Sequence, residues 1–308
     1  MTTKTISIRA RGLTKVYRGR AVVDRLDLEV PTGVVAGFVG PNGAGKTTTM
    51  RMLLGLVRPS RGEATVLGHP LSDPAAYLPR VGALIEGPAF YPALSGRKNL
   101  EVLATVGGHD LGQVPELLHQ VGLAGRADDP TGTYSLGMKQ RLGIAGALLG
   151  DPELLVLDEP ANGLDPAGIR QMRELVGGLA RHDRTVLVSS HVLSELEQVC
   201  TWLLMIDDGR LVFQGPAAEL LDQTVTRLAV ACERPADVAR LGRVLNGDGH
   251  RVRVETAAAF VDVDGEDPRR LAAAVNRAAF EAGVVLVELR PVRTTLEDRY
   301  LSMVGGER

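Results

Sequence analysis

Gly40-Pro41-Asn42-Gly43-Ala44-Gly45-Lys46-Thr47-Thr48 is the stretch that decides the fold of this chain. It matches the phosphate-binding pattern G-x-x-x-x-G-K-[ST] at every fixed position. A continuous apolar run over residues 34–39 precedes it, which is typical of a buried parallel strand. Apolar residues recur at helical spacing after it, at Met50, Leu53, Leu54 and Val57. The sequence therefore predicts a strand, a phosphate-binding loop and a helix in succession.

The residues of this loop suit a nucleotide. Gly40, Gly43 and Gly45 let the backbone turn tightly and bring amide groups close to phosphate oxygens. The start of the helix adds partial positive charge at the same place. We expect Lys46 to reach the β- and γ-phosphates and the Thr47 hydroxyl to ligate Mg²⁺. A glycine-rich turn that matches by chance is the alternative, and the flanking strand and helix disfavour it. The nucleotide-binding residues predicted here are Gly40, Asn42, Gly43, Ala44, Gly45, Lys46, Thr47 and Thr48.

The composition excludes other classes of partner. The chain has 308 residues, with 35 Lys and Arg against 37 Asp and Glu, and a formal net charge of −2. Because there is no basic excess, we expect no nucleic-acid partner. Cys200 and Cys232 have no metal-type spacing, and so few cysteines fit a reduced, cytosolic setting. No run approaches the ~20 apolar residues of a membrane span, so work at a membrane would need a partner subunit.

Two carboxylates end a second buried run. Leu154–Leu157 is apolar throughout and leads into Asp158 and Glu159. Ligands of open α/β sheets bind at the carboxyl ends of the strands. We therefore expect Asp158 to hold Mg²⁺ and Glu159 to orient or deprotonate water. An acid pair that only caps the next turn is the alternative. His191 follows another apolar strand, residues 185–190, and this shared edge favours a functional over a purely structural role.

Other segments place these motifs in a larger fold. Residues 5–30 carry clustered and alternating apolar residues around a turn, which predicts an antiparallel edge sheet. Tyr17 lies at the end of the first segment of this sheet. It is either a half-buried aromatic of the strand or a platform on which adenine stacks, and the spacing leaves both alternatives open. Residues 63–85 predict further strands. Residues 94–150 show the i, i+3, i+4 periodicity of amphipathic helices, and we interpret them as a helical insertion between two halves of an α/β core.

One further segment, Tyr134-Ser135-Leu136-Gly137-Met138-Lys139-Gln140-Arg141, resembles the signature of the ATP-binding subunits of ABC transporters. With the phosphate loop, residues 154–160, residues 163–166 and Ser190-His191, the order and spacing of motifs resemble that family over residues 5–220. The form of the signature, together with residues 83–92, is similar to the bacitracin and lantibiotic resistance branch.

This resemblance implies ATP and Mg²⁺ as cofactors and ATP hydrolysis as the activity. It implies a head-to-tail homodimer in which Ser135 and the Gly137 amide contact the γ-phosphate bound to the other copy. Asp165 would link the two sites, His191 would sense or stabilise the γ-phosphate, and Tyr17 would stack on adenine. A separate transmembrane permease would hold the chain at the cytoplasmic face of the membrane and export drugs, antibiotics or peptides. A soluble ABC-type ATPase with a non-transport role is the alternative.

The chain departs from the family pattern at two places. Tyr134 and Leu136 stand where the family usually has leucine and the first glycine of the signature. Glu86 stands where the family usually has a glutamine that touches Mg²⁺ and the attacking water. Glu86 is therefore a candidate metal ligand, or it turns towards the membrane partner, and we favour coupling to that partner.

The pattern restarts beyond the region of resemblance. We place an ABC-type ATPase domain at residues 1–222 and an accessory or regulatory domain at residues 223–308. Strand and helix patterns in the second domain follow the order β-α-β-β-α-β, which predicts a small ferredoxin-like α+β fold. The whole chain is thus expected to be α/β: a phosphate-loop NTPase core with an antiparallel β subdomain and a helical insertion, plus this tail. The tail is either an interaction module or a packing appendage.

Overall fold

The computed structural model describes residues 5–180, 184–222, 226–255, 258–263 and 267–293, with Tyr300 and Met303. The chain divides into two compact units, the first ending at Ala218 and the second beginning at Glu219. This division lies close to the predicted domain boundary, and residues 223–225 at that boundary lie outside the described residues. Each unit has a hydrophobic core of its own.

A six-stranded sheet forms the centre of the first unit, with the strand order β10-β9-β3-β8-β7-β6. All neighbouring strands are parallel except β10, which is antiparallel to β9. Every residue of the inner strands β3, β7 and β8 is buried, as the apolar runs in the sequence predict. The strands are β3 (Val35–Val39), β6 (Val81–Leu84), β7 (Leu154–Leu157), β8 (Thr185–Ser190), β9 (Trp202–Asp207) and β10 (Arg210–Pro216).

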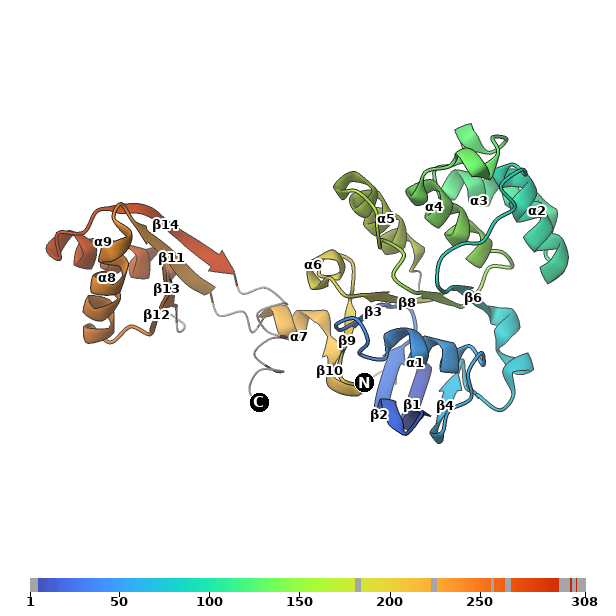
Figure 1. The fold of residues 1–308 in the computed structure, drawn as a ribbon, viewed down its shortest axis with the longest axis horizontal. Helices are drawn as coiled ribbons and strands as arrows, with labels where there is room; N and C mark the ends of the chain where they lie inside the picture. Colours follow the sequence, from blue (N-terminus) through green and yellow to red (C-terminus); the bar gives the residue numbers. More distant parts are fainter. Residues whose placement is uncertain are drawn as a thin grey trace. The chain divides into compact units, whose positions relative to one another are not determined.

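Different elements cover the two faces of this sheet (Figure 1). Helix α1 (Lys46–Leu53) lies on one face, together with an antiparallel sheet of order β2-β1-β4-β5. Phe38, Met50 and Met52 are fully buried where these layers meet. Helices α5 (Pro166–Leu179) and α6 (Leu193–Leu196) lie on the other face. The antiparallel strands are β1 (Ile6–Tyr17), β2 (Arg20–Pro31), β4 (Arg61–Val66) and β5 (His69–Pro70).

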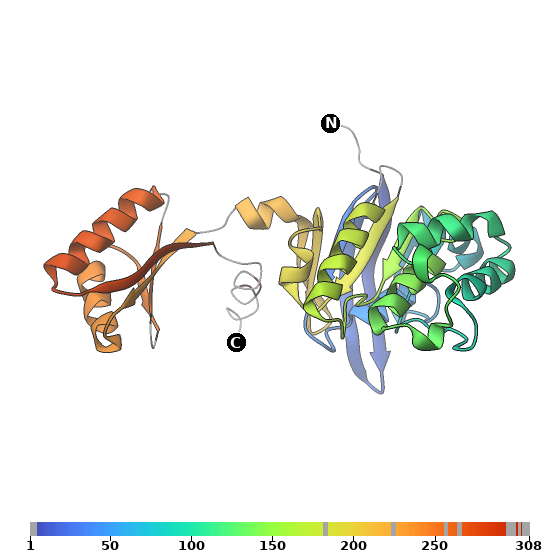
Figure 2. The same ribbon diagram turned by 90° about the horizontal axis from the view of Figure 1, so that it is seen from above.

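The predicted helical insertion contains α2 (Gly96–Gly107), α3 (Val114–Gln120) and α4 (Leu136–Ala147). These helices gather at the β6 end of the central sheet, seen from above in Figure 2. Helix α4 packs directly on β6. Their backbones approach so closely that a Cβ added at Gly82 would overlap the carbonyl oxygen of Ala147. Single 3₁₀ turns lie at Pro74–Ala76, Leu78–Arg80, Leu111–Gln113, Ala124–Arg126 and Thr131–Thr133.

We expect Gly82→Ala to lower the free energy of unfolding of the first unit by about 1–3 kcal/mol, because the backbone of α4 has to move away from β6. Urea unfolding followed by the fluorescence of Trp202 measures this, since Trp202 lies in β9 and is the single tryptophan of the chain. Gly178→Ala in α5 is the control: no neighbouring atom lies within 4 Å of its added Cβ. An unchanged unfolding midpoint for Gly82→Ala would contradict the close approach.

The second unit has the predicted β-α-β-β-α-β order, and its strands lie in the order β12-β13-β11-β14. All neighbouring strands are antiparallel. Helices α8 and α9 cover one face, and Val230, Leu241 and Val275 are fully buried between the layers (Figure 1). The ferredoxin-like prediction is therefore confirmed. The elements are β11 (Thr226–Cys232), α8 (Pro235–Gly247), β12 (Val252–Val254), β13 (Ala259–Asp262), α9 (Pro268–Glu281) and β14 (Leu286–Arg293), preceded by α7 (Ala217–Asp222).

Candidate nucleotide-binding site

The phosphate loop joins β3 to α1 as the sequence predicts. Gly43 and Gly45 have φ angles of 84° and 105°, a left-handed conformation that favours glycine. A Cβ at Gly40 would overlap the carbonyl oxygen of Ile206, so this position also requires glycine. Gly45 precedes the first residue of α1, which directs the amide groups at the start of this helix to the loop. Such a loop at a helix start is suited to bind phosphate.

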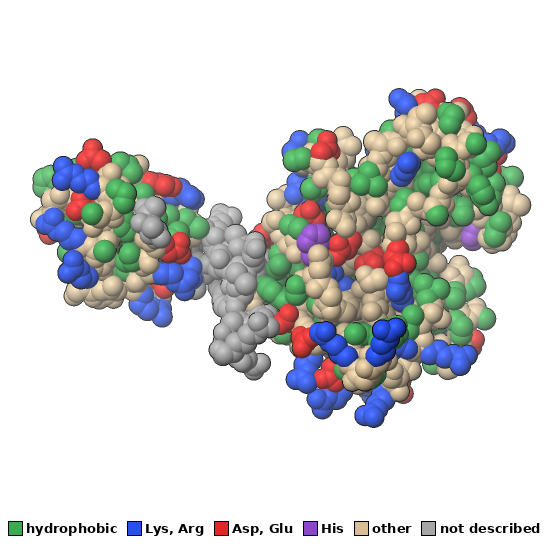
Figure 3. Space-filling view, viewed as in Figure 1, with side chains coloured by type: hydrophobic (Ala, Val, Ile, Leu, Met, Phe, Trp, Pro, Cys, Tyr) green, Lys and Arg blue, Asp and Glu red, His purple; other side chains and the backbone are tan. Residues whose placement is uncertain are grey.

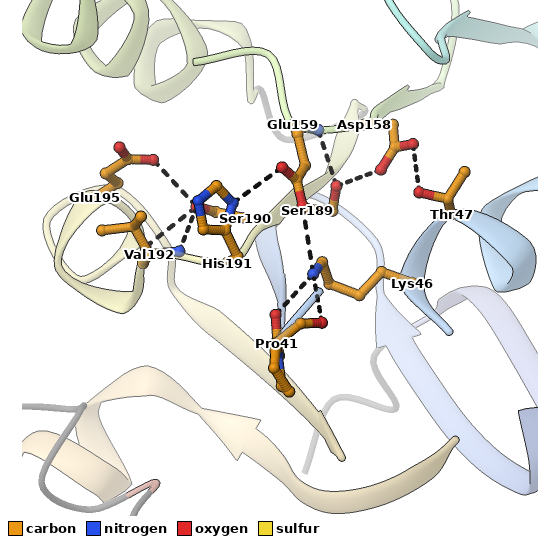
Figure 4. A network of polar contacts seen from close by, with 11 residues as sticks. Pro41, Lys46, Thr47, Asp158, Glu159, Ser189, Ser190, His191, Val192 and Glu195 are labelled. Carbon is orange, nitrogen blue, oxygen red and sulfur yellow. Dashed lines mark hydrogen bonds and ion pairs between the residues drawn. The ribbon is translucent and has the colours of Figure 1, made fainter. Parts of the chain in front are cut away.

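Lys46 is buried beneath the loop, with 4% of its surface exposed. Its Nζ donates to the carbonyl oxygens of Gly40 at 2.7 Å and Pro41 at 3.2 Å. The same Nζ lies 3.3 Å from Oε1 of Glu159 (Figure 4). A buried ammonium group is costly unless it is paired, and Glu159 supplies the compensating charge. This cation is thus held at the place where phosphate oxygens are expected to enter.

Thr47 and Asp158 meet at the carboxyl edge of the central sheet. The Thr47 hydroxyl donates to Oδ2 of Asp158 at 2.7 Å, although the two residues are far apart in the sequence. Both side chains present oxygen atoms, the ligand type that Mg²⁺ prefers. The pair therefore fits a Mg²⁺ site of the kind predicted.

Glu159 lies at the centre of a polar network (Figure 4). Its Oε1 contacts Lys46, and its Oε2 lies 2.9 Å from Nδ1 of His191. An ionised carboxylate only accepts hydrogen bonds, so Nδ1 of His191 is the donor in this pair. The Glu159 amide donates to the Ser189 hydroxyl at 2.9 Å, and the φ of Glu159 is 46°, in the left-handed region. The structure therefore brings together the two predicted catalytic residues, Glu159 and His191.

Behind His191, Ser190 and Glu195 hold the loop that carries the imidazole. The Ser190 hydroxyl lies 3.0 Å from Oε2 of Glu195 and accepts from the amide of Val192 at 2.9 Å. Glu159, His191 and Glu195 line a small hollow of about 110 Å³. In the space-filling view, one histidine side chain lies beside acidic side chains in the region of α6 (Figure 3).

The predicted signature residues form a separate group at the start of α4. Ser135 precedes this helix, and its Oγ accepts from the amide of Met138 at 3.3 Å. A Cβ at Gly137 would lie 3.6 Å from Leu164, next to Asp165. Asp165 caps α5 by accepting from the amide of Gly168 at 2.8 Å.

The two departures in the signature have plain packing reasons. Tyr134 is 4% exposed and donates its hydroxyl to the carbonyl oxygen of Arg126 at 2.5 Å. Burial raises the pKa of this phenol above its ordinary value, so it acts as a hydrogen-bond donor inside the helical segment. Leu136 is 47% exposed and lies against Gly163, within the same group of loops.

Tyr17 ends β1 and pairs with Arg20 across the turn to β2. Its ring is half exposed and lies 4.9 Å from the ammonium of Lys15. Arg20 lines a hollow of about 560 Å³ together with Asn42 and Ala44 of the phosphate loop. Tyr17 is thus the strand partner of a residue that lines this hollow, and its contact with adenine stays a prediction.

Glu86 forms an ion pair with Arg51 of α1. Its side chain is well exposed, at 64%, and its φ is 60°. The carboxylate is thus engaged with α1, and this contact decides neither for the metal role nor for the coupling role. Both stay predictions.

Three members of these networks were not predicted from the sequence: Ser189, Glu195 and Arg51. The register of the parallel strands offers a way to predict the contact between Ser189 and Asp158. Strands β7 and β8 are parallel, with Leu157 opposite Val188, so the next residues along each strand, Asp158 and Ser189, are neighbours. No comparable signal in the sequence pairs Arg51 with Glu86.

The parallel sheet, the phosphate loop and the paired acids at its carboxyl edge define a phosphate-loop nucleoside triphosphatase. Comparisons with known proteins identify the family within this class. The family model described as ABC transporter matches residues 23–162. The uncharacterized ABC transporter ATP-binding protein YhcH of Bacillus subtilis is 38% identical, covering 98% of this chain and 97% of that protein. The bacitracin transport ATP-binding protein BcrA of Bacillus licheniformis is 36% identical, covering 97% of each.

A solved structure titled as the ATP binding subunit of an ABC transporter has a TM-score of 0.62 and 29% identity, covering 71% of this chain and 93% of that chain. This chain therefore belongs to the ATP-binding subunits of ABC transporters. The predicted family and fold class are confirmed. The chain binds ATP and couples its hydrolysis to transport, and its partner is a separate permease. In the described part of the chain, no helix is both long and apolar enough to cross a membrane.

Proposed function

We propose that this chain hydrolyses ATP to drive the export of antibiotics, other drugs or peptides from the cytoplasmic face of a membrane. The names of its relatives support the substrate class. BcrA is named for bacitracin transport, SrtF of Streptococcus pyogenes for lantibiotic transport, and DrrA of Streptomyces peucetius for daunorubicin and doxorubicin resistance. These names favour transport over the non-transport alternative.

The position of Glu159 between Lys46 and His191 carries the proposed mechanism. When phosphates enter, the Lys46 ammonium exchanges its present partners for phosphate oxygens. Oε1 of Glu159 is then left to take a proton from the attacking water, while His191 keeps the carboxylate oriented through Oε2. Thr47 and Asp158 would hold Mg²⁺, which would supply charge that offsets the negative charge of the phosphates.

Reconstitution tests the transport proposal. The tagged chain is isolated from membranes with its transmembrane subunit and placed in liposomes so that ATP reaches it from outside. The proposal expects ATP-dependent uptake of daunorubicin, bacitracin or a lantibiotic into the lumen. The complex carrying Lys46→Ala is the control. Absence of uptake for all three compounds, with ATP hydrolysis intact, would contradict the substrate class.

The signature group supports a homodimer. Ser135 and Gly137 lie at the start of α4, where helix amides and partial positive charge favour an anion. The hydrogen bonds of the Lys46 network described above include neither of these residues. A second copy placed head to tail would bring its signature to the phosphate loop of the first, and symmetry would complete both sites. Asp165, beside the signature, would then lie near the junction of the two sites.

We expect Ser135→Arg to prevent ATP-dependent dimerisation of the purified chain, because the long side chain would fill the space proposed for the γ-phosphate. Size-exclusion chromatography with light scattering measures the dimer, in a Glu159→Gln background that keeps ATP uncleaved. Val106→Arg adds the same charge to the same helical segment, at an exposed position of α2, and should still dimerise. Equal dimerisation of both variants would refute the head-to-tail arrangement.

A further inference from the structure

Ser189 joins the two acids of the site through one hydroxyl group. Its side chain lies at the end of β8 and is fully buried. The hydroxyl donates to Oδ1 of Asp158 at 2.6 Å and accepts from the Glu159 amide at 2.9 Å (Figure 4). The hydroxyl thus gives its single proton to Asp158 and accepts one from the backbone of Glu159.

The bond to Asp158 fixes the orientation of its carboxylate plane, because each of the two oxygens has a different partner. Oδ1 is engaged by Ser189, and Oδ2 accepts from the Thr47 hydroxyl. Without the Ser189 bond, the carboxylate could rotate about its terminal torsion, which has broad minima. Hydrogen bonds to ionised groups are also stronger than those between neutral groups. Ser189 therefore holds Asp158 in the orientation that presents Oδ2 to the phosphate loop.

The bond to Glu159 acts on the backbone. A left-handed φ is unfavourable for a residue with a side chain, so it persists only where surrounding contacts hold it. The amide of Glu159 is fixed by Ser189, and this conformation directs the side chain between Lys46 and His191. One hydroxyl thus links the orientation of Asp158 to that of Glu159.

The neighbouring serine provides a comparison within the same strand. Ser190 is also buried, but its hydroxyl is bonded to Glu195 and to the backbone of Val192. The two serines thus differ in their partners and share their strand and residue type. Replacing each serine in turn therefore distinguishes an effect on the orientation of Asp158 and Glu159 from an effect on the packing of β8.

We propose that Ser189 is a positioning residue that aligns Asp158 for the metal ion and Glu159 for the attacking water. This inference rests on the proposed roles of Asp158 and Glu159. Ser189 itself touches neither nucleotide nor metal in this scheme.

The test measures metal affinity without turnover. Mn²⁺ replaces Mg²⁺, ADP is the nucleotide, and electron paramagnetic resonance gives the affinity of Mn²⁺ for the chain–ADP complex. Ser189→Ala is expected to weaken Mn²⁺ binding about tenfold, the size expected for losing a hydrogen bond to a charged group. ADP affinity in EDTA should stay within about twofold, since the hydrogen bonds of the Ser189 hydroxyl are made with Asp158 and Glu159. Ser189→Thr keeps the hydroxyl and should restore the Mn²⁺ affinity.

Turnover gives a second readout. Ser189→Ala should lower kcat about tenfold with little change in KM for ATP, because the loss falls on the alignment of the acids. Ser190→Ala should leave the Mn²⁺ affinity unchanged. An unchanged Mn²⁺ affinity in Ser189→Ala, or an equal loss in Ser190→Ala, would overturn the proposal.

Asp158→Asn distinguishes this inference from the function on which it rests. If Asp158→Asn weakens Mn²⁺ binding and Ser189→Ala does not, only the role of Ser189 fails. If neither variant weakens it, the metal role proposed for Asp158 fails as well. Thermal melting of each variant identifies any loss of affinity that comes from unfolding.

Discussion

Replacing Glu159 with glutamine is expected to lower ATP turnover by at least about a hundredfold, the lower end expected for losing a positioned general base. Glutamine has nearly the same shape but cannot take a proton from water. The side chain also contacts Lys46, so its loss of charge leaves that ammonium without its carboxylate partner. Phosphate oxygens can then take that place without competition. We therefore expect ATP to bind at least as tightly to the variant as to the unchanged chain.

Two measurements separate these effects. Phosphate release under saturating ATP gives kcat, and equilibrium titration with ATP gives the dissociation constant. Glu153→Gln is the matched control, because Glu153 lies just before β7, at the other end of the strand, and is paired with Arg80 at the surface. Near-normal turnover in Glu159→Gln would show that another group activates the water. Weaker ATP binding in that variant would contradict the competition between Glu159 and phosphate for Lys46.

The backbone of the site was predictable because β3, β7 and β8, the strands that carry it, are buried on both faces. Such strands appear in the sequence as unbroken apolar runs, and the residues that follow them share one edge. That rule places Asp158, Glu159 and His191 at the same edge of the sheet from the sequence alone. The phosphate loop is equally evident, since Gly43 and Gly45 occupy a left-handed conformation that few other residues adopt.

Side-chain partners were harder to predict, because they depend on tertiary packing. Nothing in the order of residues indicates that Arg51 of α1 pairs with Glu86. Ser189 could have been found from the parallel register of β7 and β8, but only after those strands were known to be neighbours. Tyr17 shows the remaining limit. Its pairing with Arg20 at the end of β1 is compatible with both alternatives, because strand periodicity does not indicate a ligand contact.

The second unit was predictable for a different reason. Its two helices are amphipathic, and β13 alternates between buried and half-buried residues, so the order β-α-β-β-α-β can be derived from hydrophobic patterning. Its function is not accessible in this way. Fold and function are separable, and no cluster of chemically active residues was apparent in its sequence.

Replacing Lys46 with alanine is expected to weaken ATP binding at least about a hundredfold, through loss of charge-assisted hydrogen bonds worth about 1.5–3 kcal/mol each. The change also removes the partner of Glu159, leaving a carboxylate beside the entry point of a polyanion. Repulsion therefore adds to lost attraction, and Lys46→Ala should bind ATP more weakly than the double variant with Glu159→Gln.

Equilibrium titration of the single and double variants measures this coupling as a double-mutant cycle. The exposed Lys98→Ala in α2, where Lys98 pairs only with Glu101 among the ion pairs of the described residues, is the control and should bind ATP normally. If Lys46→Ala and the double variant bind ATP equally, Glu159 exerts no repulsion on the phosphates. The buried Lys46–Glu159 pair would then serve only to stabilise the fold. If instead the double variant recovers part of the lost affinity, the same ion pair both holds the empty site together and is broken by the nucleotide, which ties ATP binding to the release of Glu159 for catalysis.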